Sequence, residues 1–191
     1  MYNSGGVFIK SLDGFNLLVT VQGHKDSQSG EELMGIEEIE LALSSYEPIL
    51  YIKESQYPNV ILVELTMDPE EAVMILKEAP TTVISKVIPI DYVVKTQIDA
   101  ILEKTLLIAR EKMSSGESFV VRGDLRGRRY IKSKEELIER VYDEIFNKLD
   151  ISLDPQSQDN ENPDWIIQIE VVGDDTGISI LKPHQILKKY L

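Results

Sequence analysis

Short apolar runs rich in β-branched residues alternate with longer amphipathic segments along this chain of 191 residues. The run FNLLVTVQG at 15–23 has the composition of a strand, whereas GEELMGIEEIELAL at 30–43 carries aliphatic residues at helical spacing. This alternation excludes an all-α and an all-β fold, because both kinds of element recur in both halves of the chain. The sequence therefore predicts an α+β fold with helices packed on sheets.

The first half of the chain predicts six elements in the order βαββαβ. After the strand and helix above, the Pro58-Asn59 pair marks a hairpin turn between ILYIK and VILVELT. Asp68 and Pro69 supply the N-cap and first-turn proline of a second helix, and a strand over 82–94 closes the series. This order is that of the ferredoxin-like split βαβ arrangement. We assign residues 1–94 to an N-terminal ferredoxin-like domain.

The second half, residues 95–191, predicts a second domain of the α/β type. It opens with a helix in KTQIDAILEKTLLIAREKM and a short strand in SFVVRG, followed by a loop rich in basic residues. Ser133 and Glu136 form a capping box at the start of the next helix. The runs DWIIQIEVV and GISIL bracket GDDT and predict a hairpin, and PHQILKKYL predicts a terminal helix.

The composition excludes several kinds of site. The chain has no cysteine and two histidines, which removes thiolate chemistry and leaves little for a histidine metal site. The start, MYNSGGVFIK, lacks the residue order of a signal peptide, and no apolar run reaches the roughly 18 residues of a membrane helix. We therefore expect a cytoplasmic protein with no metal site and no membrane contact.

Motifs for catalysis are also missing from the sequence. Neither G-x-G-x-x-G nor GK[ST] occurs, and His24 and His184 have no serine or acid motif to join. The Asp174-Asp175 pair sits between two predicted strands, where a tight turn favours aspartate. We expect no catalytic residues and no cofactor, so that the protein is not an enzyme by itself.

Positive charge is concentrated in one stretch of an acidic protein. The net charge is −13, with −10 in residues 1–94 and −3 in 95–191, yet residues 119–134 hold six basic residues and one acid. A solvated loop would explain this composition, but guanidinium groups suit bidentate phosphate contacts and favour a phosphate-rich partner. The candidates are Arg122, Arg126, Arg128, Arg129, Lys132 and Lys134, with Lys86, Lys182, Lys188 and Lys189 as weaker ones.

The segment GESFVVRGDLRGRRYIKSKEELIERVYDEIF resembles the central strand, basic loop and helix of the THUMP RNA-binding domain, and NPDWIIQIEVVGDDTGISIL is similar to its later hairpin. The resemblance implies a THUMP domain that binds RNA, chiefly the acceptor arm of tRNA, rather than DNA. It also implies that Arg122 at the end of the strand, and Arg126, Arg128 and Arg129 in the loop, lie on the basic surface of the family. The standalone members imply a non-catalytic adaptor that presents tRNA to a separate acetyltransferase for N4-acetylcytidine formation.

Two alternatives stay open on the sequence. The chain could be a tRNA-modifying enzyme with an unrecognised active site, or a subunit of another modification complex such as one for thiolation or methylation. It could also be a ferredoxin-like regulatory or protein-interaction module, because the acidic N-terminal half could dock a basic surface.

Overall fold

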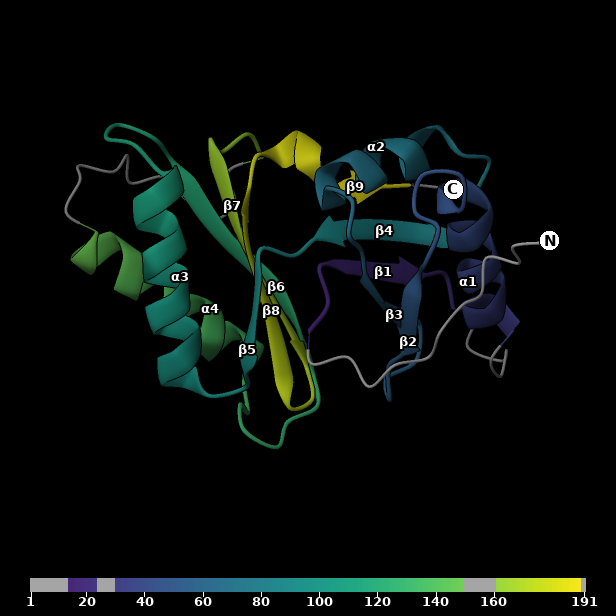
Figure 1. Ribbon diagram of the computed structural model, residues 1–191. Coiled ribbons are helices and arrows are strands. Elements are labelled where there is room, and N and C mark those ends of the chain that lie inside the picture. The colour runs from purple at the N-terminus through teal and green to yellow at the C-terminus, as the bar shows by residue number, and fades with distance from the viewer. Residues whose placement is uncertain (1–13, 24–29, 150–160, 190–191) are drawn as a thin grey trace. The chain divides into compact units, whose positions relative to one another are not determined.

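A computed structural model of the chain describes residues 14–23, 30–149 and 161–189. The chain divides into two compact units, Met1–Ile90 together with Gln185–Leu191, and Asp91–His184. We call the first unit 1 and the second unit 2. Among the described residues, each unit contains one β-sheet and two α-helices (Figure 1). The α+β class predicted from the sequence is confirmed.

Unit 1 has the predicted element order βαββαβ, followed by a further short strand from the C-terminal end. Its five-stranded sheet has the strand order β2-β3-β1-β4-β9, and every neighbouring pair is antiparallel. The elements are β1 (Leu17–Val21), α1 (Gly30–Leu43), β2 (Tyr51–Glu54), β3 (Val60–Glu64), α2 (Pro69–Glu78), β4 (Ile84–Pro89) and β9 (Leu187–Lys188).

Two local signals in unit 1 are confirmed. Asn59 has a left-handed φ of 66° between β2 and β3, a conformation that asparagine tolerates in turns. The side chain of Asp68 accepts a hydrogen bond of 2.9 Å from the first turn of α2, and Pro69 begins the helix. The helices then bury residues such as Ile39 and Leu76 in a core shared with the sheet.

Unit 2 places both of its α-helices on one face of a four-stranded sheet. The strand order is β5-β8-β7-β6, in which β6 and β7 are parallel and the other pairs antiparallel. The predicted hairpin of the sequence is the β7–β8 pair. The elements are β5 (Tyr92–Lys95), α3 (Ile98–Lys112), β6 (Phe119–Arg126), α4 (Lys134–Lys148), β7 (Trp165–Val172) and β8 (Asp175–Leu181), with a short 3-10 helix η1 (Pro183–Gln185) after them.

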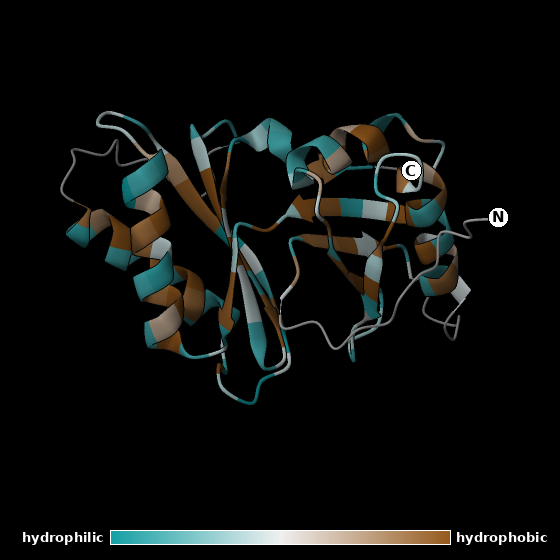
Figure 2. Ribbon diagram, in the orientation of Figure 1, coloured by the Kyte–Doolittle hydropathy of each residue, from teal (hydrophilic) through white to brown (hydrophobic). Residues whose placement is uncertain are grey.

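The two faces of the unit 2 sheet have different chemistry. The face that α3 and α4 cover is aliphatic, with Val121, Ile169 and Ile180 in the buried core. Figure 2 shows hydrophobic and hydrophilic stretches along the strands of this sheet. Alternation along a strand sends neighbouring residues to the other face. The other face therefore carries Arg122 opposite Gln168. Asp124 and Arg126 follow on the same face of β6, so this face is polar at its centre.

Gly123 allows β6 to lie close to β7. A Cβ atom at this position would stand 2.0 Å from the carbonyl oxygen of Ile169, its partner in the parallel register. Backbone atoms cannot yield as a flexible side chain would, so the strand needs glycine here. The role of Gly123 is thus to allow the close approach of two strands.

The C-terminal elements differ from the prediction. The expected strand over 82–94 is two strands, because β4 belongs to the unit 1 sheet and β5 pairs with β8 in unit 2. The expected terminal helix in PHQILKKYL is wrong, since η1 is followed by β9, which pairs with β4. Main-chain pairing with strands far away in sequence outweighs the weak local helix signal. The chain accordingly passes from one unit to the other at 90/91 and again at 184/185, whereas the sequence predicts a single boundary at 94/95.

The two units carry almost equal net charge. Unit 1 has seven lysines and fourteen acidic residues, a net of −7, and unit 2 has thirteen basic and nineteen acidic residues, a net of −6. The contrast expected between the two halves of the sequence therefore depends on where the boundary is drawn. Positive charge is a local property of one segment of unit 2.

Candidate nucleic-acid interface

The basic stretch of the sequence consists of two structurally different parts. Strand β6 continues to Arg126, three residues beyond the strand that the sequence predicts. The basic loop, residues 127–134, then leads into α4 and includes its first residue. Arg122 and Arg126 thus lie on a strand, and the expectation that Arg126 lies in the loop is wrong. The other four main candidates are Arg128, Arg129, Lys132 and Lys134, all in the basic loop.

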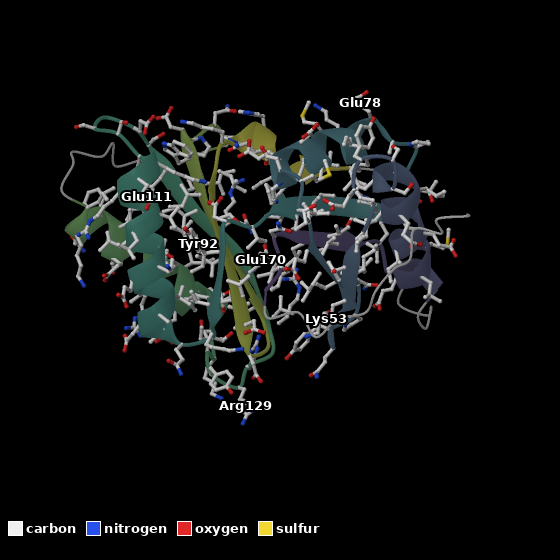
Figure 3. All side chains as sticks on the ribbon, viewed as in Figure 1. Lys53, Glu78, Tyr92, Glu111, Arg129 and Glu170 are labelled. Atoms are coloured by element: carbon white, nitrogen blue, oxygen red, sulfur yellow. The ribbon has the colours of Figure 1, made fainter. Side chains whose placement is uncertain are left out.

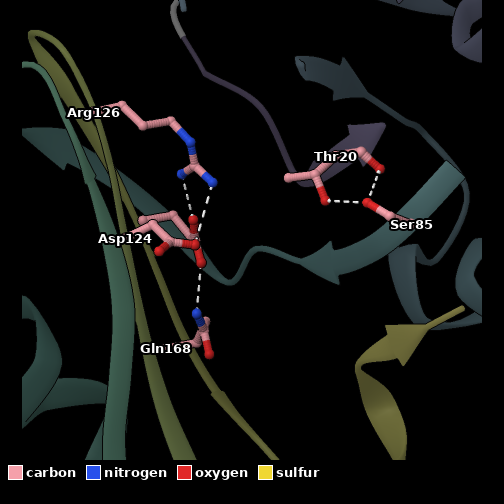
Figure 4. A network of polar contacts seen from close by, with 6 residues as sticks. Thr20, Ser85, Asp124, Arg126 and Gln168 are labelled. Carbon is pink, nitrogen blue, oxygen red and sulfur yellow. Dashed lines mark hydrogen bonds and ion pairs between the residues drawn. The ribbon is translucent and has the colours of Figure 1, made fainter. Parts of the chain in front are cut away.

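Arg126 is held in a network of buried and partly buried polar groups (Figure 4). Its Nη1 donates to Oε2 of Glu170 at 2.6 Å, and its Nη2 lies 3.3 Å from Oδ2 of Asp124. The side chain of Arg126 is 15% exposed and that of Glu170 is fully buried. Gln168 donates to the second carboxylate oxygen of Glu170 at 2.5 Å. The guanidinium therefore neutralises a buried carboxylate of the neighbouring strand, and little of its charge faces solvent.

Arg122 lies four residues before Arg126 on the same face of β6 and is partly exposed. Its register partner is Gln168. Both strand arginines therefore belong to the polar face of the sheet, and Arg126 is bonded there to Glu170 of β7. Arg122 and Arg126 are therefore strand residues and not residues of a solvated loop.

Arg128 and Arg129 are exposed at the start of the basic loop. Gly127 turns the chain there with a left-handed φ of 85°, which ends β6. The Arg129 guanidinium is 76% exposed, lies 5.2 Å from the ring centroid of Tyr130 and is 3.9 Å from a carboxylate oxygen of Asp174. Figure 3 shows Arg129 at the outer end of the loop, pointing away from the sheet. Such a weak, exposed ion pair leaves the guanidinium available to a ligand.

Lys132 organises the basic loop from within. Its Nζ donates hydrogen bonds to the backbone carbonyls of Arg128 at 2.6 Å and Arg129 at 3.1 Å. These bonds close the loop over four residues and fix the backbone from which the two arginines project. Lys132 thus contributes charge to the surface and also holds its shape.

The capping box at the start of α4 is half confirmed. Ser133 Oγ accepts a hydrogen bond of 3.2 Å from the backbone N–H of Glu136, as predicted. The Ser133 hydroxyl donates a hydrogen bond to the carboxylate of Glu135, whereas the capping box expected from the sequence pairs Ser133 with Glu136. Hydrogen bonds from its own backbone N–H and from Ser133, with the positive charges of Lys134 and Arg128, lower the pKa of Glu135. The first amides of α4 are therefore partly occupied by groups of the protein itself.

A small hollow lies between the basic loop and the first turns of α4. Its volume is about 150 Å³, and Arg140 of α4 lines it together with Tyr130 and Lys132 of the basic loop. Arg140 was not a candidate in the sequence, although it lies four residues after Glu136 and so on the same side of the helix. The remaining lining residues are Ile98, Ile131, Glu136 and Leu137.

Three of the weaker candidates belong to unit 1 rather than to unit 2. Lys86 and Lys188 are register partners on β4 and β9. The Nζ of Lys189 donates to the carbonyl of Ala79 at 3.0 Å and to the hydroxyl of Thr81 at 2.5 Å. Lys189 thereby ties the C-terminal strand to the end of α2. Its ammonium has a structural use, and none of the three extends the basic loop within unit 2.

The fourth weaker candidate, Lys182, stands over an aromatic ring at the end of β8. Its Nζ is 3.7 Å from the ring centroid of Trp165 and 3.6 Å from a carboxylate oxygen of Glu117. The Trp165 indole donates to Glu117 at 2.6 Å. Although slight burial acts to raise the pKa of Glu117, hydrogen bonds from Ser114 and Trp165 and the charge of Lys182 lower it. The cluster anchors the beginnings of β6 and β7.

The residues considered for catalysis lie apart. Asp174 and Asp175 stand at the β7–β8 turn as expected, and Asp175 pairs with Lys95 at 2.7 Å. His184 lies in η1, and His24 is outside the described residues. Within 14–23, 30–149 and 161–189, no three histidine or acidic side chains are grouped to hold a metal ion. Over the same ranges, every helix is too short or too polar to cross a membrane.

Comparison with known proteins identifies part of the chain. Residues 95–181 match the family model of the THUMP domain, so this part of unit 2 is a THUMP domain. It includes β6, the basic loop and α4. None of the curated proteins matches the chain significantly.

Several solved structures share the fold. The chain is similar to PH1313 from Pyrococcus horikoshii Ot3, with a TM-score of 0.67 and 20% identity over 92% of this chain and 56% of that one. It is similar to a 4-thiouridine synthetase solved with RNA and ATP (TM-score 0.60, 13% identity, 93% and 42% covered). It is also similar to TrmN from Thermus thermophilus (0.55, 16%, 92% and 46%). The chain spans about half the length of these proteins, and at such identities the likeness concerns the fold alone.

Proposed function

Because residues 95–181 are a THUMP domain, we propose that the chain binds tRNA and presents it to a separate modifying enzyme. The bound part is the acceptor arm, and the enzyme is an acetyltransferase that forms N4-acetylcytidine. The chain itself contributes no catalytic residue. The solved relative with RNA bound, a 4-thiouridine synthetase, supports RNA as the ligand class. The adaptor role rests on the resemblance of the sequence to standalone THUMP proteins.

The observation that carries the RNA-binding proposal is the composition and exposure of the basic loop. Residues 127–134 contain four basic residues and no acid. Lys132 closes the backbone that carries Arg128 and Arg129, and both residues are exposed. Guanidinium groups match phosphate oxygens in bidentate geometry. A loop of this kind holds a phosphate backbone in place without reading the bases.

Selection of tRNA then follows from shape. Double-stranded RNA presents a shallow minor groove with its phosphates and 2′-hydroxyl groups, which proteins recognise largely by form. A compact cluster of charges suits a few neighbouring phosphates of one helix end. At a Debye length of about 8 Å, the acidic residues elsewhere in the chain are largely screened from such a local contact.

The salt dependence of tRNA binding tests the proposed surface. Arg126 is occupied by Glu170, so we expect the four loop cations to make the phosphate contacts. The logarithm of the affinity should fall against the logarithm of salt concentration with a slope of about −2.8 to −3.6 for about four contacts. A slope near zero would contradict phosphate binding by this loop. An acceptor-arm minihelix should compete with whole tRNA, and a single-stranded RNA of equal length should compete poorly, because it lacks the double-stranded form.

Reconstitution tests the adaptor role. Purified chain, unmodified tRNA and acetyl-coenzyme A should give no N4-acetylcytidine, and addition of a tRNA acetyltransferase should give product that depends on the chain. Mass spectrometry of digested tRNA measures the modified nucleoside. Modification of tRNA by the chain alone, with an acetyl, methyl or sulfur donor, would instead make it the enzyme.

A further inference from the structure

An open apolar groove runs between α1 and α2 of unit 1. Its volume is about 530 Å³, and the residues that line it come from the last turn of α1, the turn after it, and the second half of α2. The groove belongs to unit 1, whereas the basic loop belongs to unit 2. Its lining residues are Ala42, Ser45, Tyr46, Met74, Ile75, Glu78 and Ala79.

Large apolar side chains stand exposed in this groove and along α1. Tyr46 is 58% exposed and Met74 is 54% exposed, one from each wall. Leu41, on the solvent side of α1, is 83% exposed. Met34 lies seven residues before Leu41 and so on the same side of the helix. Apolar residues gathered around a groove and rimmed by polar ones are typical of a protein–protein contact.

The rim of the groove is strongly acidic. Helix α1 holds five glutamates and no basic residue, and α2 holds three glutamates and Lys77. Glu78 lines the groove and stands at the outer surface of α2 in Figure 3. Glu71 and Met74 share its side of the helix. Among the described residues, the carboxylates of Glu71 and Glu78 form no ion pair with a basic side chain of this chain.

Other acids of these helices serve the fold itself. Glu32 accepts a hydrogen bond of 2.6 Å from the backbone N–H of Asn59. Glu38 accepts from the hydroxyl and N–H of Thr82, two residues before β4. Although partial burial acts to raise the pKa of Glu38, these bonds lower it. Glu71 and Glu78 have no such bonds within the described part of the chain and lie on the same side of α2 as Met74, so their carboxylates are available to a partner at the groove.

The chemistry of the groove selects its occupant. A nucleic acid is excluded because its phosphates would meet a rim of carboxylates. A partner that fits must bring apolar side chains for Tyr46 and Met74 together with positive charge for Glu71 and Glu78. The groove lies between two helices, which is the setting in which an amphipathic helix places its apolar face. A lysine- or arginine-rich amphipathic helix satisfies both requirements.

We propose that the α1–α2 groove binds a basic amphipathic helix of a protein partner. The helix places apolar residues between Tyr46 and Met74, and its basic residues face Glu71 and Glu78. The identification of that partner as the catalytic subunit rests on the proposed function. The chain would then hold tRNA with unit 2 and the enzyme with unit 1.

Binding of a designed peptide to the full chain tests the groove. The probe is a synthetic peptide of about 15 residues, the length at which isolated helices begin to be stable in water. It carries leucine on one helical face and lysine on the other, and a matched peptide has glutamate in place of each lysine. Fluorescence anisotropy should show binding of the lysine peptide, weakened by salt, and no binding of the glutamate peptide.

Two pairs of variants locate the site. Met74→Glu should weaken binding of the lysine peptide by about tenfold or more, because a central apolar contact is lost. Leu107→Glu is its control, since Leu107 is also exposed but lies on α3 of unit 2. Glu78→Lys should weaken binding, whereas Glu111→Lys on α3 should not. Each pair changes the net charge equally, so a difference within a pair reports position.

Several outcomes would overturn the proposal. If both variants of a pair weakened peptide binding equally, the peptide would be attracted by the overall charge of the chain. If the lysine and glutamate peptides bound equally, the binding would be non-specific. Concentration-dependent dimers that Met74→Glu dissolves, with no peptide competition, would make a second copy the occupant. Absence of any peptide binding would also overturn it.

The same variants separate this proposal from the proposed function. Met74→Glu should leave tRNA affinity unchanged, because the basic loop belongs to the other unit. If the wild-type chain binds no tRNA, the proposed function fails while the peptide result still decides the groove. If tRNA binding persists and reconstituted acetylation falls in Met74→Glu, the catalytic subunit is the partner.

Discussion

Arginines of the strand and of the loop differ in what their charge does, although only three positions separate Arg126 from Arg129. Arg126 is largely buried and bonded to Glu170 of the neighbouring strand. Arg129 is 76% exposed beside Tyr130, with one long ion pair to Asp174. A guanidinium next to a buried carboxylate stabilises the fold, whereas an exposed one is free to meet a phosphate. Local charge density in a sequence therefore overestimates the charge offered to a ligand.

The largest expected effect comes from the strand. Arg126→Ala leaves the Glu170 carboxylate buried without its cation, which should lower the free energy of unfolding by about 3–5 kcal/mol. Urea denaturation followed by circular dichroism measures the loss. Adding Glu170→Gln should restore part of the stability, because the uncompensated charge is removed. Arg110→Ala on α3, an exposed position, is the control and should change stability by less than about 0.5 kcal/mol. A stable Arg126→Ala protein that no longer bound tRNA would erase the distinction between strand and loop.

The second effect tests the backbone of the same strand. Gly123→Ala places a methyl group against the carbonyl oxygen of Ile169. The strands must then move apart, at a cost of about 1–3 kcal/mol in the free energy of unfolding. Gly30→Ala is the matched control, because its added methyl group meets nothing within 4 Å. An unchanged urea midpoint for Gly123→Ala would mean that β6 and β7 have more freedom than their register indicates.

The third effect concerns the loop and should appear in binding alone. Arg128→Ala combined with Arg129→Ala removes about two phosphate contacts, so the slope against salt should become shallower by about 1.4 to 1.8. We expect the Kd for tRNA to rise by about tenfold, or about 1.4 kcal/mol, without change in the urea midpoint. Filter binding over a series of salt concentrations measures both quantities. Arg110→Ala serves again as control, and equal losses in the two proteins would remove the special role of the loop.

The smallest effect concerns the opposite end of β6 and depends on pH. Asp164 accepts hydrogen bonds from the backbone N–H of Ser118 at 2.8 Å and from its hydroxyl at 3.0 Å. These bonds lower the pKa of Asp164 below its ordinary value of 3.8, against a smaller opposing contribution from burial. The stability that these hydrogen bonds contribute is fully present above the ordinary pKa and is lost as the pH falls through the lower pKa of the folded protein.

Asp164→Asn should accordingly destabilise the protein by less than about 1 kcal/mol at neutral pH. The difference from the wild type should shrink on acidification, because the wild-type carboxylate also becomes neutral. Urea midpoints measured between neutral pH and pH values below 3.8 give the comparison. A difference that grew at low pH would reverse the sign and contradict the depressed pKa.

Much of the local structure follows from signals close together in sequence. Ser133 caps α4 three residues before the N–H it binds, and Asp68 and Pro69 begin α2 as short-range rules require. The β2–β3 and β7–β8 hairpins also form where turn residues predict them. These features succeed because each depends on neighbours within a few positions.

The predictions from the sequence are wrong where β-strand pairing joins segments that are far apart in the chain. The segment 187–188 is a strand because β4 lies beside it, and nothing in PHQILKKYL reports that partner. The same reason splits 82–94 between two sheets. The apolar groove of unit 1 likewise depends on α1 and α2 lying side by side. Its exposed residues Tyr46 and Met74 are 28 positions apart in the sequence, so no local pattern predicts the groove.

The sequence by itself determined the α+β class, the order of the elements in unit 1, the capped helix α4 and the presence of a basic segment that resembles a THUMP domain. Only the tertiary structure decided which of the basic residues are offered to a ligand. Arg126 is neutralised by Glu170, 44 residues further along the chain, because β6 and β7 lie in parallel register. Arg128 and Arg129 remain exposed because Gly127 turns the chain away at the end of β6, and the two arginines therefore lie outside the sheet.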